Sequence, residues 1–377
     1  MKLLRLKATN YRCLRDVSIE LEDFNLFIGA NASGKSTILD ALRFLHEGVH
    51  ARDFDAPMFS RGGILNLAWK GEQARQIDLA VTLQDDVEST EWAIQITRQG
   101  HHFRVGERVA RLPSQSPPVV LLEADGGTGW WWSNTTSERV EMQQPATVCA
   151  LAAAAADASF PAREIADFVR RWGFFDPNPF LLRRDWSGLD SSRLDHYGRN
   201  LGETLHALAS SSPEIVDRIR SATQNIVGLP ASIETRAMEG RFYFVQSEPA
   251  LRFSVHQMGV SSGTLRTLAL MTALLGEPKT NLLGIEEPEN YLHPSALSAF
   301  VEYLRESQDR VQFMVTTHSP LLLDLLDDPG SVCVVQRSDG EGTAAYRETN
   351  PNGVRNALSA SGFSLGEFYQ TKGFGAP

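Results

Sequence analysis

One glycine-containing stretch, residues 29–37, constrains the fold of this chain more than any other. It reads GANASGKST, which has the Gly-x4-Gly-Lys-Ser spacing of a phosphate-binding loop. The apolar run 26–28 before it is typical of a buried strand. Apolar residues recur at helical spacing after it, at Ile38, Leu39, Leu42 and Leu45. A strand, a tight loop and a helix N-terminus together predict triphosphate binding, because inward-facing amides and the positive end of the helix dipole attract anions.

Each residue type in this loop has an expected role. Lys35 is expected to reach the β- and γ-phosphates, and Ser36 to hold Mg²⁺ through its hydroxyl. ATP and Mg²⁺ are therefore the expected cofactors. The loop residues expected to contact the nucleotide are Asn31, Ala32, Ser33, Gly34, Lys35, Ser36 and Thr37.

Net charge, cysteine spacing and the length of apolar runs limit the classes of protein to which this chain can belong. The net charge of −10 does not support a surface coated in basic residues, although a local basic patch remains compatible with it, so nucleic-acid binding is neither indicated nor excluded. Cys13, Cys149 and Cys333 are widely spaced and suggest neither disulfides nor a zinc site. The N-terminus has too short an apolar core for a signal peptide, and no run is long enough to cross a membrane. We expect a cytoplasmic protein.

Hydrophobic periodicity predicts strands at both ends of the chain. Alternation indicates strands at residues 2–9, 17–21 and 25–28, followed by an antiparallel meander at 77–83, 92–98 and 103–112. Residues 119–122 resume as a strand. The triple tryptophan 130–132 is predicted to pack against neighbouring structure, with base stacking as the less favoured alternative.

The middle of the chain is predicted to be mostly helical. Residues 146–158, 162–172, 201–210 and 213–227 have helical composition or periodicity, and the segment 172–184 reads as a proline-interrupted linker. Short strands follow at 233–236 and 242–245. No sustained heptads occur, so no coiled-coil arm is expected.

A second anion site is predicted where small residues open a helix. Ser261, Ser262 and Gly263 directly precede apolar residues at helical spacing. Taken alone, this stretch is better explained as a simple helix cap, and it is its position before the acidic strand end that favours an anion site.

Paired carboxylates end the next apolar strand, 281–285. In nucleotide hydrolases the first carboxylate orders Mg²⁺ through water and the second polarises the attacking water, which are the roles expected of Glu286 and Glu287. A further apolar strand, 311–317, is followed directly by His318. In an open α/β sheet, ligands bind at the carboxyl ends of the strands, which is the position of this histidine. We expect His318 to contact the γ-phosphate.

Together these stretches resemble the ABC-type ATPases of the group that spans the RecF, SMC and OLD (overcoming lysogenization defect) families. The likeness covers nearly the whole chain and is closest to small stand-alone bacterial members labelled as AAA-family ATPases. It matches residues 10–12 to an N-terminal phrase, 260–264 to the ABC signature, and 290–293 to the D-loop. The resemblance implies that Arg12, in the first of these, contacts the nucleotide. Arg61-Gly62-Gly63, residues 176–179 and residues 365–369 also look like the stand-alone group.

The resemblance implies an α/β fold. It predicts an ABC-type head with a mixed sheet, an antiparallel β-subdomain and a helical insertion. We expect an N-terminal ATPase lobe at 1–125, a mostly helical insertion at 126–250 and a C-terminal ATPase lobe at 251–377.

The resemblance also implies a mechanism. ATP held by the loop of one subunit would meet Ser261, Ser262 and Gly263 of a second, and hydrolysis by Glu287 and His318, with Lys35 as the third catalytic residue, would separate the homodimer. The chain departs from the family pattern at Glu286, where Asp is commoner, and at Ser262 and Thr264 in the signature. The Q-loop glutamine is not assigned: Gln84, Gln143 and Gln144 remain open.

Three functional hypotheses follow. The first is an ATPase switch in DNA maintenance or antiphage defence, with a separately encoded effector and possible DNA binding but no membrane. The second is a nuclease like OLD proteins that carry a Toprim domain, which the roughly sixty residues after His318 disfavour. The third is an ATP-binding scaffold or antitoxin-like regulator with weak turnover.

Overall fold

A computed structural model describes residues 1–70, 74–85, 87–100, 102–184, 193–228, 232–249, 252–277, 279–338, 340–371 and 374. The chain forms two compact units. Unit 1 comprises Met1–Trp172 and Gly330–Asn350, and unit 2 comprises Gly173–Pro329 and Pro351–Pro377. The division at 1–125, 126–250 and 251–377 stays a prediction.

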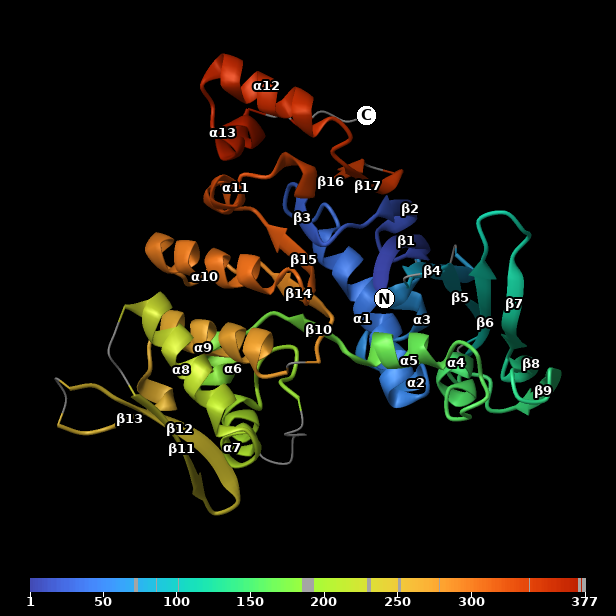
Figure 1. The fold of residues 1–377 in the computed structure, drawn as a ribbon, viewed down its shortest axis with the longest axis horizontal. Coiled ribbons are helices and arrows are strands. Elements are labelled where there is room, and N and C mark those ends of the chain that lie inside the picture. Colours follow the sequence, from blue (N-terminus) through green and yellow to red (C-terminus); the bar gives the residue numbers. More distant parts are fainter. Residues whose placement is uncertain are drawn as a thin grey trace. The chain divides into compact units, whose positions relative to one another are not determined.

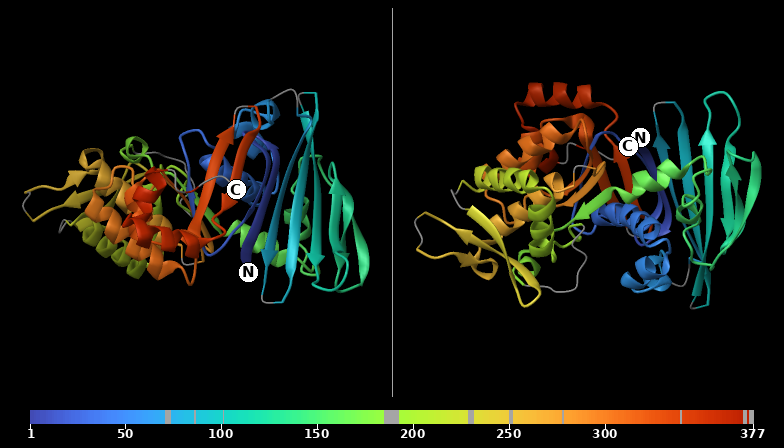
Figure 2. Two further views of the ribbon diagram at one scale, coloured as in Figure 1. Left: turned by 90° about the horizontal axis from the view of Figure 1, so that it is seen from above. Right: turned by 60° about the horizontal axis from the view of Figure 1, so that its bottom comes forward.

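An antiparallel sheet is the largest element of unit 1, and its strands lie side by side in Figure 2. Their order is β2-β1-β4-β5-β6-β7-β8-β9. Alternate residues of β4 are buried, as its sequence predicts for a strand with one face on the core. The strands are β1 (Lys2–Tyr11), β2 (Leu14–Glu20), β4 (Gln76–Gln84), β5 (Ser89–Gln99), β6 (His102–Leu112), β7 (Val119–Asp125), β8 (Thr128–Ser133) and β9 (Glu138–Gln143).

A second, mixed group of strands in unit 1 supports the loop. Strand β3 (Phe24–Ile28) is buried along its whole length and pairs in parallel with β16 (Val332–Ser338), which pairs antiparallel with β17 (Gly342–Arg347). Helix α1 (Lys35–Ala51) follows the loop and buries its apolar side. The remaining helices of this unit are α2 (Asp55–Ser60), α3 (Ile64–Leu67), α4 (Ala150–Ala154) and α5 (Arg163–Arg170).

Unit 2 is built around the parallel strands β14 (Leu282–Glu286) and β15 (Gln312–Thr317). Helix α9 (Ser262–Leu275) is buried on almost every side from Thr264 onward. The hairpin β11 (Ser232–Met238) and β12 (Arg241–Ser247) pairs with β13 (Val255–His256). The other elements are α6 (Pro179–Leu182), α7 (Leu201–Ser211), α8 (Pro213–Val227), η2 (Gln257–Gly259), α10 (Pro294–Ser307), α11 (Pro320–Leu326), α12 (Pro351–Ser361) and α13 (Leu365–Gln370), most of them labelled in Figure 1, with η3 (Pro329–Ser331) at the boundary.

The mixed α/β class predicted from the sequence is confirmed, and two local predictions are wrong. The expected linker 172–184 contains strand β10 (Trp172–Phe175), whose four residues are all buried, so it shows no alternation that could reveal a strand. The expected helix 146–158 is helical only at Ala150–Ala154.

Two further sequence features can be placed. Trp131 packs edge-on against Phe160 at 5.7 Å between ring centroids, and the Arg139 guanidinium lies 3.9 Å from the Trp130 ring centroid, so these two tryptophans have intramolecular contacts. Among the described residues, no helix combines the length and apolar character needed to cross a membrane.

Candidate functional site

The phosphate-binding loop leaves β3 through Gly29. This glycine has φ 153°, and a Cβ on it would lie 2.0 Å from the carbonyl oxygen of Val335 on β16. Only glycine fits such a close backbone approach. Strand β16 therefore forces the chain to turn sharply at the position where the loop begins.

Lys35 and Ser33 are the buried polar residues of the loop. Lys35 Nζ donates to the carbonyls of Gly29 at 3.0 Å and Ala30 at 3.1 Å, which folds its side chain back over the loop. Ser33 is 3% exposed, and its hydroxyl has no hydrogen-bond partner among the described residues. A buried hydroxyl without a partner is unfavourable unless a ligand completes it.

Of the other loop residues expected to contact the nucleotide, Gly34 is buried and the rest are exposed or half-buried. Asn31, Ala32 and Ser36 are exposed, and Thr37 is half-buried in the first turn of α1. The Thr37 hydroxyl accepts a hydrogen bond from Cys13 Sγ at 3.3 Å, which ties the β1–β2 turn to the helix that follows the loop.

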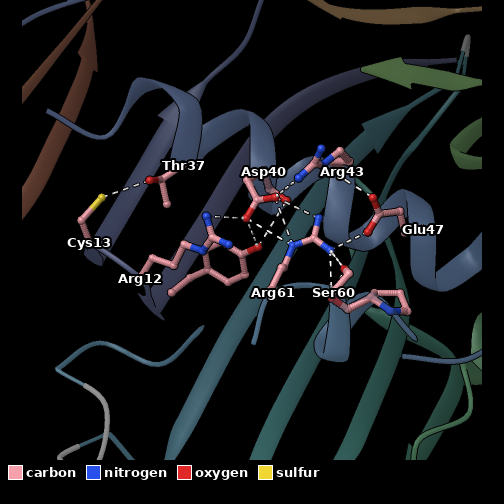
Figure 3. A network of polar contacts seen from close by, with 10 residues as sticks. Arg12, Cys13, Thr37, Asp40, Arg43, Glu47, Ser60 and Arg61 are labelled. Atoms are coloured by element: carbon pink, nitrogen blue, oxygen red, sulfur yellow. Dashed lines mark hydrogen bonds and ion pairs between the residues drawn. The ribbon is translucent and has the colours of Figure 1, made fainter. Parts of the chain in front are cut away.

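A buried charge cluster lies on α1 behind the loop, centred on Asp40 (Figure 3). Arg61 and Arg43 approach its carboxylate at 2.9 and 2.8 Å, Arg12 at 3.3 Å, and the Tyr11 hydroxyl donates to it at 2.8 Å. Burial alone would raise the pKa of Asp40, but the three guanidinium groups outweigh it and lower the pKa to about 2. Asp40 is therefore ionised.

The cluster fixes Arg12, the N-terminal arginine expected at the nucleotide. Arg12 has a positive φ of 49°, and its amide donates to Leu67 O at 2.6 Å. Its guanidinium remains 37% exposed while paired with Asp40. Arg12 thus combines a fixed backbone with a partly accessible charge.

The loop fits a nucleotide phosphate group. Three groups of donors can bind an anion here: the buried Lys35, the buried Ser33 hydroxyl, which has no partner among the described residues, and the N-terminus of the 17-residue helix α1. Within the described part of the chain, no group of three His, Cys, Asp or Glu side chains could hold a metal by itself.

The carboxylates lie in unit 2, where β14 ends. Glu287 has φ 43°, a left-handed conformation that costs a non-glycine residue about 1–2 kcal/mol. Its amide donates to Thr316 O on β15 at 3.0 Å. Asn290 Nδ2 donates to Glu287 Oε2 at 2.7 Å, and His318 Nε2 lies 3.4 Å from Oε1. The structure thus brings Glu287 and His318 together, with Glu286, which is half-buried, directly before them.

Glu289 anchors the histidine. Its Oε1 accepts hydrogen bonds from the Thr317 hydroxyl at 2.7 Å and from the His318 amide at 3.0 Å. Sequence reasoning assigned no role to Glu289 and matched Asn290 only to the D-loop, although the place of both residues beside the acid pair was a signal.

The signature stretch also lies in unit 2, at the start of α9. Ser261 is the N-cap residue, and its exposed side chain accepts from the Thr264 amide at 3.1 Å. A Cβ on Gly263 would lie 2.9 Å from Tyr291 O, so glycine allows the D-loop backbone to approach the helix. Ser262 Oγ accepts from Arg183 at 2.9 Å.

No Q-loop residue can be assigned. Gln84, Gln143 and Gln144 are exposed in unit 1, and no hydrogen bond among the described residues joins their side chains to the loop.

Comparisons with known proteins find related families and folds. Residues 156–324 match the family model described as "AAA domain, putative AbiEii toxin, Type IV TA system", and residues 1–99 match the model described as "AAA ATPase domain". The chain is 24% identical over 389 residues to an OLD nuclease of Thermus scotoductus, which covers 98% of this chain and 68% of that protein.

A solved structure supports the fold assignment. The SMC head bound to the C-winged helix domain of ScpA is similar with a TM-score of 0.58 and 14% identity, over 92% of this chain and 97% of that chain. An identity this low shows the fold alone. Family models, the curated relative and the shared fold together support the similarity of this chain to the OLD-like, AAA-labelled ATPases of the ABC type.

Proposed function

We propose that the chain binds ATP with Mg²⁺ on residues 29–37, hydrolyses the ATP, and uses nucleotide binding to close a homodimer. The observation that carries this proposal is the geometry around Glu287, whose carboxylate is oriented by Asn290 at 2.7 Å and lies 3.4 Å from His318. A carboxylate held by fixed neighbours at a strand end suits a residue that orients an attacking water and takes its proton.

The loop residues would bind and neutralise the phosphates. Lys35 would exchange its carbonyl partners for phosphate oxygens, and the Ser33 hydroxyl would gain the partner that it lacks among the described residues. Ser36 is proposed to bind Mg²⁺ through its hydroxyl, and Glu286 is proposed to bind it through a water molecule. When bound, ATP would supply the γ-phosphoryl group, and Mg²⁺ would offset part of the negative charge of that group.

The signature residues Ser261, Ser262 and Gly263 are proposed to contact the γ-phosphate of a second copy. Support comes from the exposed Ser261 at the N-terminus of a 14-residue helix, which offers amides and a positive dipole end. A ligand that binds only the closed pair stabilises it by mass action.

The cellular role is proposed as a conformational switch in DNA maintenance or antiphage defence, in the cytoplasm. The curated relative is named a nuclease and one family description names a toxin–antitoxin system. Those names also favour the alternative, an ATP-binding scaffold or antitoxin-like regulator of a separate effector such as a nuclease, with weak turnover.

Light scattering after size-exclusion chromatography tests the proposal, with ATPase assays on the same samples. Wild type and Glu287→Gln are compared with and without ATP and Mg²⁺, with Glu302→Gln on the exposed surface of α10 as the matched control. We expect an ATP-dependent dimer and a loss of turnover of at least about a hundredfold in Glu287→Gln alone. Wild-type turnover in Glu287→Gln would contradict the catalytic assignment, and an assembly indifferent to ATP would contradict the dimer.

A further inference from the structure

Arg266 is a buried cation that the proposed mechanism does not use. It lies on α9, is 2% exposed, and is flanked along the helix by buried threonine and leucine residues. Burying an arginine is unfavourable unless its donors are satisfied. Its partners therefore indicate what the side chain is for.

The Arg266 guanidinium joins two segments of unit 2. Its Nη2 donates to the backbone carbonyls of Glu286 and Glu287, both at 2.8 Å. Its Nη1 donates to the carbonyl of Pro177 and lies 3.3 Å from a carboxylate oxygen of Asp176. One planar side chain thus connects the carboxylate end of β14 to the Asp176-Pro177 dipeptide.

The contacts to Glu287 hold an unfavourable backbone. Glu287 has φ 43°, and a left-handed non-glycine residue persists only where its surroundings fix it. Its amide is held by Thr316 O and its carbonyl by Arg266. Removing the second contact would free the peptide that sets the direction of the Glu287 side chain.

The same residue is linked to the signature. Arg266 follows Ser262 by one helical turn, so both side chains lie on one face of α9. Arg183, at the end of α6, donates to Ser262 Oγ at 2.9 Å and to Val260 O at 3.2 Å. The segment 176–183 is therefore bound to the first turns of α9 at both of its own ends, through Asp176-Pro177 and through Arg183. These contacts give the Asp-Pro-Asn-Pro motif at residues 176–179 a structural role.

We propose that Arg266 is a positioning residue for Glu287: it fixes the left-handed peptide at the end of β14 and couples it to the N-terminal turn of α9. Contact made by Ser261–Gly263 with a ligand then sets the orientation of the Glu287 carboxylate in the same chain. This inference rests on the proposed ATPase function.

The test replaces Arg266 by lysine. Lysine keeps the charge but lacks the fork of donors that reaches both segments at once. We expect kcat to fall by about tenfold or more while KM for ATP stays within about twofold, because nucleotide binding residues are untouched. The matched control is Arg310→Lys, whose guanidinium bonds Leu274 O at the far end of the same helix, at 3.1 Å; it should retain wild-type kcat.

A double-mutant cycle separates positioning from a general loss of structure. If Arg266 acts through Glu287, Arg266→Lys should cause no further loss of kcat in a Glu287→Gln background. Equal losses in both backgrounds, or an unchanged kcat in the single variant, would overturn the inference. A Glu287→Gln protein with wild-type turnover would instead sink the proposed function, so the two failures are distinguishable.

A second variant covers the case in which Arg266→Lys does not fold. Asp176→Asn leaves Arg266 in place and removes only its charged partner, which is 41% exposed. We expect a smaller fall in kcat with KM unchanged, again absent in the Glu287→Gln background. A change in KM alone would count against the inference.

Discussion

Asn290 Nδ2 donates a hydrogen bond of 2.7 Å to Oε2 of Glu287, three residues earlier in the same turn. Glu287, the proposed general base, is therefore oriented by Asn290 of the D-loop that follows it. The left-handed backbone of Tyr291, at φ 66°, shapes the turn that makes this contact.

Asn290→Ala should lower kcat by about tenfold, because the Glu287 carboxylate loses the donor that fixes its rotamer. ATP binding and dimer closure should persist, since neither depends on that bond. Steady-state kinetics and light scattering with ATP measure the two effects, and Asn225→Ala on the exposed surface of α8 serves as the control. A fall in ATP affinity without a fall in kcat would argue against this role.

Asp40→Asn should destabilise unit 1 by about 3–5 kcal/mol, because it leaves Arg61, Arg43 and Arg12 close together without their shared counter-charge. The pKa of Asp40 is lowered from 3.8 to about 2, so its ionised form stabilises the fold above pH 4 and this contribution is lost as the pH falls toward 2. Urea unfolding of both proteins should therefore converge in acid. A constant difference from pH 6 to pH 2 would contradict the assignment.

Glu107 gives the opposite pH dependence. It is buried on β6 and accepts hydrogen bonds from Trp92 Nε1 at 3.0 Å and from the first amides of α4. Burial raises its pKa from 4.5 to about 7 despite these donors. The neutral form of Glu107 contributes its full share to the free energy of unfolding below pH 4.5. This contribution, on the order of 3 kcal/mol in total, is lost as the pH rises through 7.

Glu107→Gln should remove that pH dependence. The measurement is urea unfolding between pH 4.5 and 8.5, followed by circular dichroism. Glu123→Gln, on the exposed face of β7, should retain the wild-type slope. A wild-type slope in Glu107→Gln would show that another group is responsible.

Cys13 should be the one cysteine that alkylates in the folded protein. Burial raises the pKa of Cys333 to about 12 and that of Cys149 well above its usual value, and both side chains are inaccessible. Cys13 is partly exposed and lies 3.3 Å from the Thr37 hydroxyl, so ATP with Mg²⁺ should slow its labelling. Mass spectrometry after N-ethylmaleimide treatment, with Cys13→Ser as the control, measures this. Labelling of Cys13 at the same rate with and without nucleotide would contradict the placement of the site.

Local features of the fold were predictable because the sequence pattern carries them. The loop at 29–37 needs its glycines and its flanking strand and helix next to it in the chain, so residue types and spacing were sufficient. The same holds for Ser261 as a helix cap and for Glu287 at a strand end.

Long-range contacts were not predictable in this way. Thr343 Oγ1 donates to Ser33 O at 2.7 Å across 310 residues, and no pattern near either residue indicates the other. Arg266 is similar: nothing in the sequence around it indicates that it is buried or that the Glu286 and Glu287 carbonyls are its partners. Strand β10 was missed because burial on both faces removes alternation.

The turn at Gly29 has a consequence for biosynthesis. Its tight packing partner, Val335, and the Thr343 hydroxyl that bonds Ser33 are synthesised long after the loop, since Thr343 follows Ser33 by 310 residues. N-terminal segments generally begin to fold while synthesis continues, but this loop lacks its supporting strands until then. A nascent chain would therefore expose an incomplete anion site until β16 and β17 have been synthesised, and nucleotide would stabilise the loop only after that point.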